Sequence, residues 1–193
     1  MTLILASTSP IRHQMLEAAG VKFAAIRPDV NEDEAKSRLS DASTIAAELA
    51  CAKALSVGGG RPGYWVIGSD SVVTSSGQLF DKPRDRQDAV EHLRFFSGKP
   101  MLLTSAVALA CEQSVDWCHV ETATLHMREL SDAFIESYLD AEWPEVGYTV
   151  GVFRLEGRGV QLFESIDGDH FTILGMPLLP LLGALRERGL LRS

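Results

Sequence analysis

Basic residues are scarce in this chain of 193 residues, in which 18 lysines and arginines face 26 aspartates and glutamates. The formal net charge of −8 disfavours nucleic acid polymers and acidic membrane surfaces as partners. An anionic ligand would therefore need a local cationic pocket or a metal ion.

Cysteine and long apolar runs are scarce as well. Cys51, Cys111 and Cys118 are odd in number and lack the spacing of metal ligands, so we interpret them as reduced thiols. The apolar run at residues 3–6 is shorter than the hydrophobic part of a signal peptide, and two prolines interrupt the leucine-rich stretch near residue 180. We therefore expect a cytoplasmic protein without a membrane partner.

Apolar sequence is present in the amount that a core requires, since 46% of the residues are hydrophobic and no repeat or low-complexity tract interrupts them. Amphipathic helical stretches alternate with short apolar runs and hairpin patterns, which predicts an α/β fold with a mixed, twisted central sheet flanked by helices. A single domain over residues 1–193 is expected. The expected strands are 3–6, 21–26, 64–67, 101–110, 115–127 and 160–166, with a hairpin at 72–80. One expected helix begins at Pro10 and another is capped by Ser131. Further helices are expected over 45–57, with Ser43 or Thr44 as the N-cap, over 86–96 and over 178–188. The glycine run at 58–60 is expected to be a flexible connector.

The start of the chain predicts an anion site. An apolar run at residues 3–6 leads into Ser7-Thr8-Ser9-Pro10, and a serine N-cap followed by proline is a strong signal for the start of a helix. Free amides and the positive dipole end of such a helix attract anions, and Arg12 adds a bidentate donor in the first turn. A serine-proline helix start with an exposed arginine also occurs in proteins that lack such a site.

Further polar residues follow other expected strands. Acidic residues gather at 29–32, Asp70 follows the strand at 64–67, and Lys82 follows the hairpin. Ligands of open α/β sheets bind beyond the carboxyl ends of strands, so these residues can converge. Carboxylates suit Mg²⁺ or Mn²⁺, and cations offset phosphate charge. Metal-assisted phosphoryl chemistry is therefore predicted, although singly Asp70 could cap a turn and Glu32 could belong to a solvated acidic run.

An ordered series of motifs runs through most of the chain. It comprises Ser7-Thr8-Ser9-Pro10-x-Arg12, Pro28-Asp29-Val30-Asn31-Glu32, Lys53-Ala54, Gly68-Ser69-Asp70-Ser71-Val72-Val73, Lys82-Pro83, residues 93–98, Glu156-Gly157-x-Gly159, residues 166–171 and residues 174–178. The series closely resembles the Maf family of nucleoside triphosphate pyrophosphatases. This resemblance implies two lobes around a cleft, in an architecture similar to that of the inosine triphosphatases.

The resemblance also implies hydrolysis of a nucleoside triphosphate between its α and β phosphates, with Mg²⁺ or Mn²⁺, to a monophosphate and pyrophosphate. By position, Asp70 would be the catalytic acid that binds metal and orients or deprotonates water, and Glu32 its metal-binding partner. Lys53, Lys82 and Arg12 would hold the phosphates, the two lysines as part of the catalytic set. The other implied substrate-binding residues are Ser7, Ser9, His13, Ser71 and Glu156.

Three positions bear on substrate preference. Ser71 and Glu156 stand where members that prefer thymidine or uridine nucleotides resemble one another in having threonine and glutamine, and they look more like the subgroup that acts on 7-methylguanosine triphosphate. A glutamate can accept hydrogen bonds from the Watson–Crick edge of guanine. His13 stands where many members have a second arginine, so one permanent cation of the family pattern is missing.

Two other functions stay open. A house-cleaning pyrophosphatase of the inosine triphosphate type has a similar architecture, but its motifs are absent from this sequence. A non-catalytic nucleotide-binding regulator of cell division is the alternative outside the enzymes, and the link of the Maf family with septum inhibition supports it. The presence of Asp70, Glu32 and the three phosphate-binding cations argues against an inactive site. A homodimer is left open.

Overall fold

The computed structural model describes residues 2–58 and 63–192, and the chain divides into two compact units. The first unit consists of Met1–Ser71, Thr104–Thr122 and Asp169–Ser193. The second unit consists of Val72–Leu103 and Ala123–Gly168. Both units thus combine stretches that lie far apart in the sequence.

Among the described residues, seven strands form one mixed sheet, as the α/β prediction requires. Six of them follow one another in the order β2-β1-β3-β5-β6-β7, and β4 pairs with β3. The strands are β1 (Thr2–Ala6), β2 (Ala24–Ile26), β3 (Tyr64–Ser75), β4 (Gln78–Phe80), β5 (Pro100–Cys111), β6 (Ser114–Met127) and β7 (Phe163–Asp167). Strand β1 is parallel to β2 and β3, whereas the pairs β3–β4 and β6–β7 are antiparallel.

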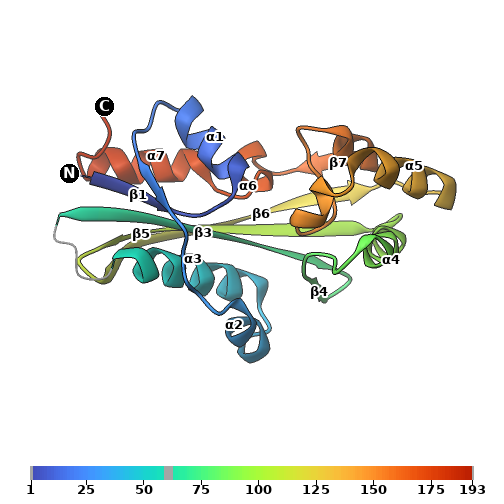
Figure 1. Cartoon of the computed structure of the whole chain (residues 1–193), viewed down its shortest axis with the longest axis horizontal. Coiled ribbons are helices and arrows are strands. Elements are labelled where there is room, and N and C mark those ends of the chain that lie inside the picture. The colour runs from blue at the N-terminus through green and yellow to red at the C-terminus, as the bar shows by residue number, and fades with distance from the viewer. Residues whose placement is uncertain (1, 59–62, 193) are drawn as a thin grey trace. The chain divides into compact units, whose positions relative to one another are not determined.

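The first unit has a helical layer on each face of its part of the sheet. Helices α1 (Pro10–Ala18) and α7 (Leu178–Glu187) lie on one face, and α2 (Glu32–Arg38) and α3 (Ala42–Gly58) lie on the other (Figure 1). Alternate side chains of a strand point to opposite faces. Leu3 and Leu5 accordingly pack in the core cluster that contains Leu16 and Leu181, while Ile4 packs in the other cluster. Burial on both faces explains why β1 is a continuous apolar run.

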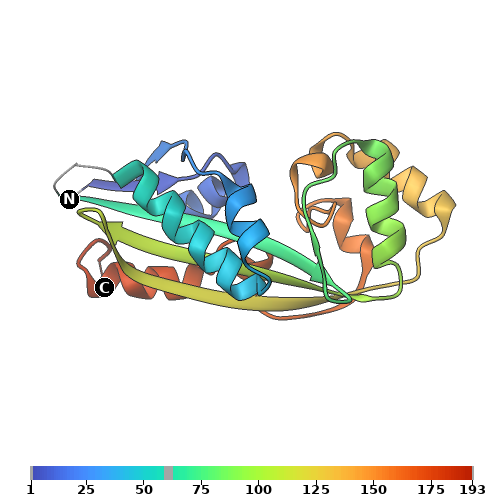
Figure 2. The same cartoon turned by 90° about the horizontal axis from the view of Figure 1, so that it is seen from below.

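The second unit contains the end of β3 from Val72 onward together with β4. It also contains α4 (Arg86–Phe96), α5 (Asp132–Glu142) and the 3₁₀ helices η1 (Glu145–Tyr148) and η2 (Arg158–Leu162). Helices α4 and α5 lie against each other (Figure 2). Aromatic rings fill the space beside α4, where Phe80 and Phe96 lie with ring centroids 4.6 Å apart. As predicted, α4 spans 86–96, and the Ser131 hydroxyl caps α5 by accepting from the amide of Phe134.

Several predicted boundaries are wrong. The strand expected at 21–26 is limited to Ala24–Ile26, because the amide of Val21 donates to the carbonyl oxygen of Leu16 at the end of α1. The strand expected at 160–166 starts at Phe163, after the 3₁₀ turn of η2. Helix α3 starts at Ala42, earlier than predicted. The capping hydrogen bond is accepted by the side chain of Asp41, from the amide of Thr44, and not by the side chain of Ser43 or Thr44. Gly58 belongs to α3, while Gly59 and Gly60 of the expected glycine connector lie outside the described residues.

The remaining expectations concern thiols and membranes. The three cysteines are free thiols. Within residues 2–58 and 63–192, every helix is too short or too polar to cross a lipid bilayer.

The terminal helix α7 ends at Glu187, one residue before its predicted end. The prolines of the leucine-rich stretch lie at its start.

Candidate functional site

Asp70 lies within a long central strand. The sequence predicted that the strand ends at residues 68–71, where small and polar residues replace the apolar run, but β3 continues to Ser75. Strand β3 has β1 on one side and β5 on the other. Ser69 and Asp70 can remain in the strand because partners from other elements satisfy their buried polar groups. Asp70 is only 6% exposed.

A glycine beside Asp70 allows α3 to approach β3 closely. A Cβ atom on Gly68 would lie 2.1 Å from the carbonyl oxygen of Ala50 and 2.5 Å from the amide nitrogen of Ala54. Any side chain at this position would push the helix away from the strand. The close contact places Lys53 of α3 within reach of the Asp70 carboxylate.

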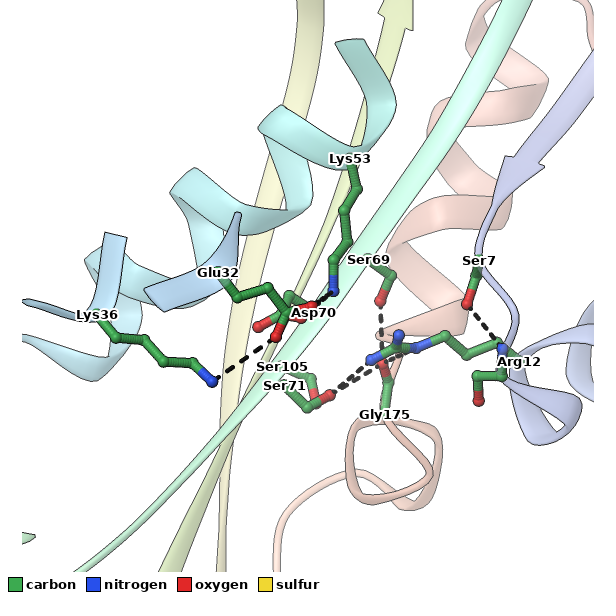
Figure 3. A network of polar contacts seen from close by, with 11 residues as sticks. Ser7, Arg12, Glu32, Lys36, Lys53, Ser69, Asp70, Ser71, Ser105 and Gly175 are labelled. Carbon is green, nitrogen blue, oxygen red and sulfur yellow. Dashed lines mark hydrogen bonds and ion pairs between the residues drawn. The ribbon is translucent and has the colours of Figure 1, made fainter. Parts of the chain in front are cut away.

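Lys53 joins two carboxylates that are far apart in the sequence. Its Nζ lies 2.6 Å from Oδ1 of Asp70 and 2.7 Å from Oε1 of Glu32, the first residue of α2 (Figure 3). Lys36, one turn further along α2, lies with its Nζ 3.7 Å from Oε2 of Glu32. Positive and negative side chains therefore alternate from Lys36 through Glu32 and Lys53 to Asp70.

Burial weakens the solvation of two of the charges in this site. Burial raises the pKa of Asp70, and the nearby positive charges of Lys53 and Arg12 oppose this rise. Burial also lowers the pKa of Arg12, opposed by the negative charges of Asp70 and Glu32. Poorly solvated charges interact strongly with any further ion that enters. Such an environment suits the binding of an anionic group together with a cation.

Arg12 is held by the loop after α6 (His170–Ile173). Its Nε donates to the carbonyl oxygen of Gly175 at 2.9 Å, and its Nη2 donates to Oγ of Ser71 at 3.0 Å (Figure 3). Gly175 has a φ of +102°, and a Cβ atom there would lie 3.2 Å from Oγ of Ser71 and 3.4 Å from Nη2 of Arg12. Glycine is therefore required both for the backbone conformation and for the closeness of the arginine.

The loop between β1 and α1 is held by its own side chains. The Oγ of Ser7 accepts a hydrogen bond from the amide of Ser9 at 3.1 Å, and Ser9 is the N-cap of α1, as predicted. Nε2 of His13 lies 2.9 Å from the carbonyl oxygen of Ser7, so this nitrogen is the donor of the pair. The His13 ring also packs edge-on against Phe23, with ring centroids 5.7 Å apart.

Eight of the ten residues implied by the sequence lie in the first unit. The structure connects Glu32, Lys53 and Asp70 in one set of contacts, connects Arg12 with Ser71 in a second, and connects Ser7, Ser9 and His13 in a third. Lys82 and Glu156 belong to the second unit and are solvent-exposed, and their part in the site stays a prediction.

Sequence reasoning missed several residues that contact this set. Lys36 follows Glu32 by four residues, which is the spacing of neighbours on one face of a helix, but no helix was predicted over residues 32–38. Ser69 donates to the carbonyl oxygen of Gly175 at 3.0 Å. Ser105 contacts Ser71 from β5, where the adjacent polar pair Thr104-Ser105 within an otherwise apolar run was the available signal.

The donor set fits a hard divalent cation that arrives with a phosphate ligand. Over the described residues, the structure contains no group of three or more histidines, cysteines, aspartates or glutamates that could hold a metal ion. Asp70 and Glu32 nevertheless both direct a carboxylate oxygen at Nζ of Lys53. Mg²⁺ keeps several waters and is commonly held by one or two carboxylates together with substrate phosphates.

The chain is similar over nearly its whole length to a sequence family and to several named proteins. A sequence model described as "Maf-like protein" matches residues 2–188. The chain is 45% identical over 191 residues to the nucleoside triphosphate pyrophosphatase of Nitrobacter hamburgensis, covering 98% of this chain and 95% of that protein. It is equally 45% identical over 191 residues to the 7-methyl-GTP pyrophosphatase of Rhizobium etli, covering 97% and 96%. The solved structure of a nucleoside-triphosphatase (dITP/XTP pyrophosphatase) of Mycobacterium abscessus aligns with 66% of this chain and covers 73% of its own chain, at 14% identity and a TM-score of 0.37.

Proposed function

Because the chain belongs to the Maf-like family, we propose that it hydrolyses nucleoside triphosphates to the monophosphate and pyrophosphate. The observation that carries this proposal is the buried Asp70, in contact with a lysine that it shares with Glu32. The names of the two relatives in Nitrobacter and Rhizobium agree with this reaction.

The charged residues suit phosphoryl transfer, which requires mainly positioning and charge compensation. We assign Arg12 and Lys53 to the phosphates, with Lys82 as a third cation from the second unit. Asp70 is the group that orients or deprotonates water. Its raised pKa makes the carboxylate a stronger base than an ordinary aspartate, which favours proton removal near neutral pH.

A divalent cation, Mg²⁺ or Mn²⁺, belongs to this proposal. Asp70 and Glu32 are the residues that would hold it. When bound, such an ion supplies neutralisation of phosphate charge and lowers the pKa of a bound water. A chelator is therefore expected to abolish turnover.

The reaction is tested by product analysis. The purified protein is incubated with a panel of ordinary and modified nucleoside triphosphates and Mg²⁺ or Mn²⁺ in ¹⁸O-labelled water, and the products are separated by anion exchange. We expect equal amounts of monophosphate and pyrophosphate, with the label in the monophosphate, because water attacks the α phosphorus. A nucleoside diphosphate with orthophosphate would contradict the proposal. Nucleotide binding without turnover would instead support the regulator of cell division.

For the base, we propose a preference for 7-methylguanosine triphosphate or another purine nucleotide, with Glu156 as the discriminating residue. A carboxylate can accept hydrogen bonds from N1–H and from the N2 amino group of guanine. Uracil and thymine offer N3–H between two carbonyl oxygens, and these oxygens repel a carboxylate. Substitution Glu156→Gln is expected to narrow the difference in kcat/KM between guanine and pyrimidine nucleotides, because an amide both donates and accepts. A wild-type preference for thymidine or uridine triphosphate of about tenfold would contradict this assignment while leaving the reaction intact.

We further propose that the protein acts in the cytoplasm on free nucleotides, without a nucleic acid polymer or a membrane as partner. The net charge of −8 supports this, because a polyanion would be repelled outside the local cationic site. A homodimer is the oligomer to test by light scattering.

A further inference from the structure

Two serine hydroxyl groups, one on the half-buried Ser71 and one on the buried Ser105, lie behind Arg12. Ser71 Oγ is 2.8 Å from Oγ of Ser105 on β5, and Ser105 Oγ donates to the carbonyl oxygen of Thr172 at 2.8 Å. Ser105 and Thr172 are fully buried in the first unit. Ser105 is therefore a buried polar residue that hydrogen-bonds to Ser71, which in turn is a partner of Arg12.

The number of protons fixes the direction of these hydrogen bonds. A serine hydroxyl has one proton to donate and two lone pairs to accept with. Since Ser105 donates its proton to Thr172, it must accept the proton of Ser71 in their mutual contact. The Ser71 oxygen is then left to accept from Nη2 of Arg12 at 3.0 Å. Donation runs in one direction, from the guanidinium through two serines to a backbone carbonyl.

The alternative acceptor for the Ser71 proton is already occupied. Ser71 Oγ lies 3.2 Å from the carbonyl oxygen of Gly175, but that oxygen also accepts from Nε of Arg12 at 2.9 Å and from Ser69 at 3.0 Å. A carbonyl oxygen has two lone pairs, so the third and longest contact is the weakest. Ser105 thus keeps the Ser71 proton away from the oxygen on which Arg12 depends.

We propose that Ser105 is a positioning residue that holds Arg12 in its phosphate-binding orientation by directing the proton of Ser71 away from Gly175. This inference rests on the proposed function, because it takes Arg12 as a phosphate ligand. A long arginine side chain binds more tightly when its orientation is fixed before the ligand arrives.

The effect of Ser105 can be separated from an effect on folding. In Ser105→Ala, the carbonyl oxygen of Thr172 still accepts from the amide of Gly175 at 3.0 Å, so no buried acceptor loses its last partner. The Ser71 proton is expected to turn to the Gly175 carbonyl and compete there with Nε of Arg12. The fold should persist while the orientation of the guanidinium becomes less fixed.

The test compares Ser105→Ala with Ser75→Ala. Ser75 is the matched control, since it is 1% exposed and its hydroxyl donates to the carbonyl oxygen of Pro100 at 2.9 Å, in the second unit. Inorganic tripolyphosphate serves as the binding probe, because it offers phosphates without a base. We expect Ser105→Ala to raise its Kd and the KM for nucleotide by roughly five- to tenfold, with a smaller change in kcat. Ser75→Ala should leave both values at the wild-type level.

A double-mutant cycle with Arg12→Ala distinguishes positioning from a general structural role. If Ser105 acts through Arg12, Ser105→Ala has no further effect on tripolyphosphate binding once Arg12 is alanine. Equal losses in both backgrounds, or an unchanged Kd in the single variant, would overturn the inference. Absence of pyrophosphate release by the wild type would refute the proposed reaction, yet the binding cycle would still decide the role of Ser105. A wild type that fails to bind tripolyphosphate would overturn the inference as well.

Discussion

Replacement of Asp70 by asparagine is expected to lower turnover by about a hundredfold or more while the fold stays intact. Asparagine preserves the shape of the side chain but removes the carboxylate that acts as the base. It also removes one of the two carboxylates, those of Asp70 and Glu32, that would hold the divalent cation. The measurement is kcat for pyrophosphate release with saturating Mg²⁺. Retained activity would show that another residue activates water.

The same substitution should leave thermal stability equal or increased. Burial raises the pKa of Asp70 above its ordinary value. The stabilising contribution of this carboxyl is therefore complete below its ordinary pKa and is lost as the pH rises through the higher folded-state value. At pH 7 the carboxyl opposes folding, and asparagine removes that opposition. Lys53 is not left unpaired by this substitution, because its Nζ keeps Oε1 of Glu32 as a partner at 2.7 Å. Thermal unfolding with a chelator present measures the effect without bound metal.

Asp88→Asn provides a control of opposite sign. Hydrogen bonds from Arg84 hold the pKa of Asp88 below its ordinary value, so its contribution to stability is present above the ordinary pKa and is lost as the pH falls through the lowered one. This variant should unfold at a slightly lower temperature at pH 7 and keep full turnover. A lower Tm for Asp70→Asn than for Asp88→Asn would contradict the argument from burial.

The parts of the fold that carry local signals could be predicted from sequence. Pro10 after a serine N-cap marks the start of α1. Asp85 caps α4 by accepting from the amide of Asp88, and Gly98 follows the end of this helix with a φ of +68°. Each signal acts within a few residues, so the sequence alone contains the physical cause.

Strand β3 could not be predicted to full length because its polar residues are satisfied from far away. Locally, Ser69 and Asp70 resemble the end of a strand. Their partners are Gly175, 106 residues later, and Lys53, 17 residues earlier on α3. Tertiary contacts of this kind override local polarity.

Helix α2 was missed for a related reason. Its seven residues have no apolar periodicity, and Ala35 is the residue that it buries. Its support is electrostatic, since acidic residues occupy the first turn and Lys36 and Arg38 the last, as the helix dipole favours. Missing the helix meant missing that Glu32 and Lys36 share one face.

The Lys53→Ala variant is expected to lose both activity and stability. Removal of a cation that offsets phosphate charge should lower kcat/KM by about a hundredfold. Loss of one partner of a buried ion pair destabilises a protein by about 3–5 kcal/mol. We expect the lower end of that range, because the Glu32 side chain is 41% exposed and can turn to water. Urea unfolding and steady-state kinetics measure the two effects.

Lys36→Ala is the matched control for charge and length. Lys36 also pairs with Glu32, at 3.7 Å, but it is more exposed than Lys53. Its removal should change the unfolding free energy by less than about 1 kcal/mol.

In Lys53→Ala, Asp70 and Glu32 are both released from the lysine, so added Mg²⁺ should raise Tm more than in the wild type. Equal Tm values for the two lysine variants would contradict the stabilising role of the buried Lys53 ion pair. No response of the Tm of Lys53→Ala to Mg²⁺ would contradict the assignment of Asp70 and Glu32 to a shared cation site.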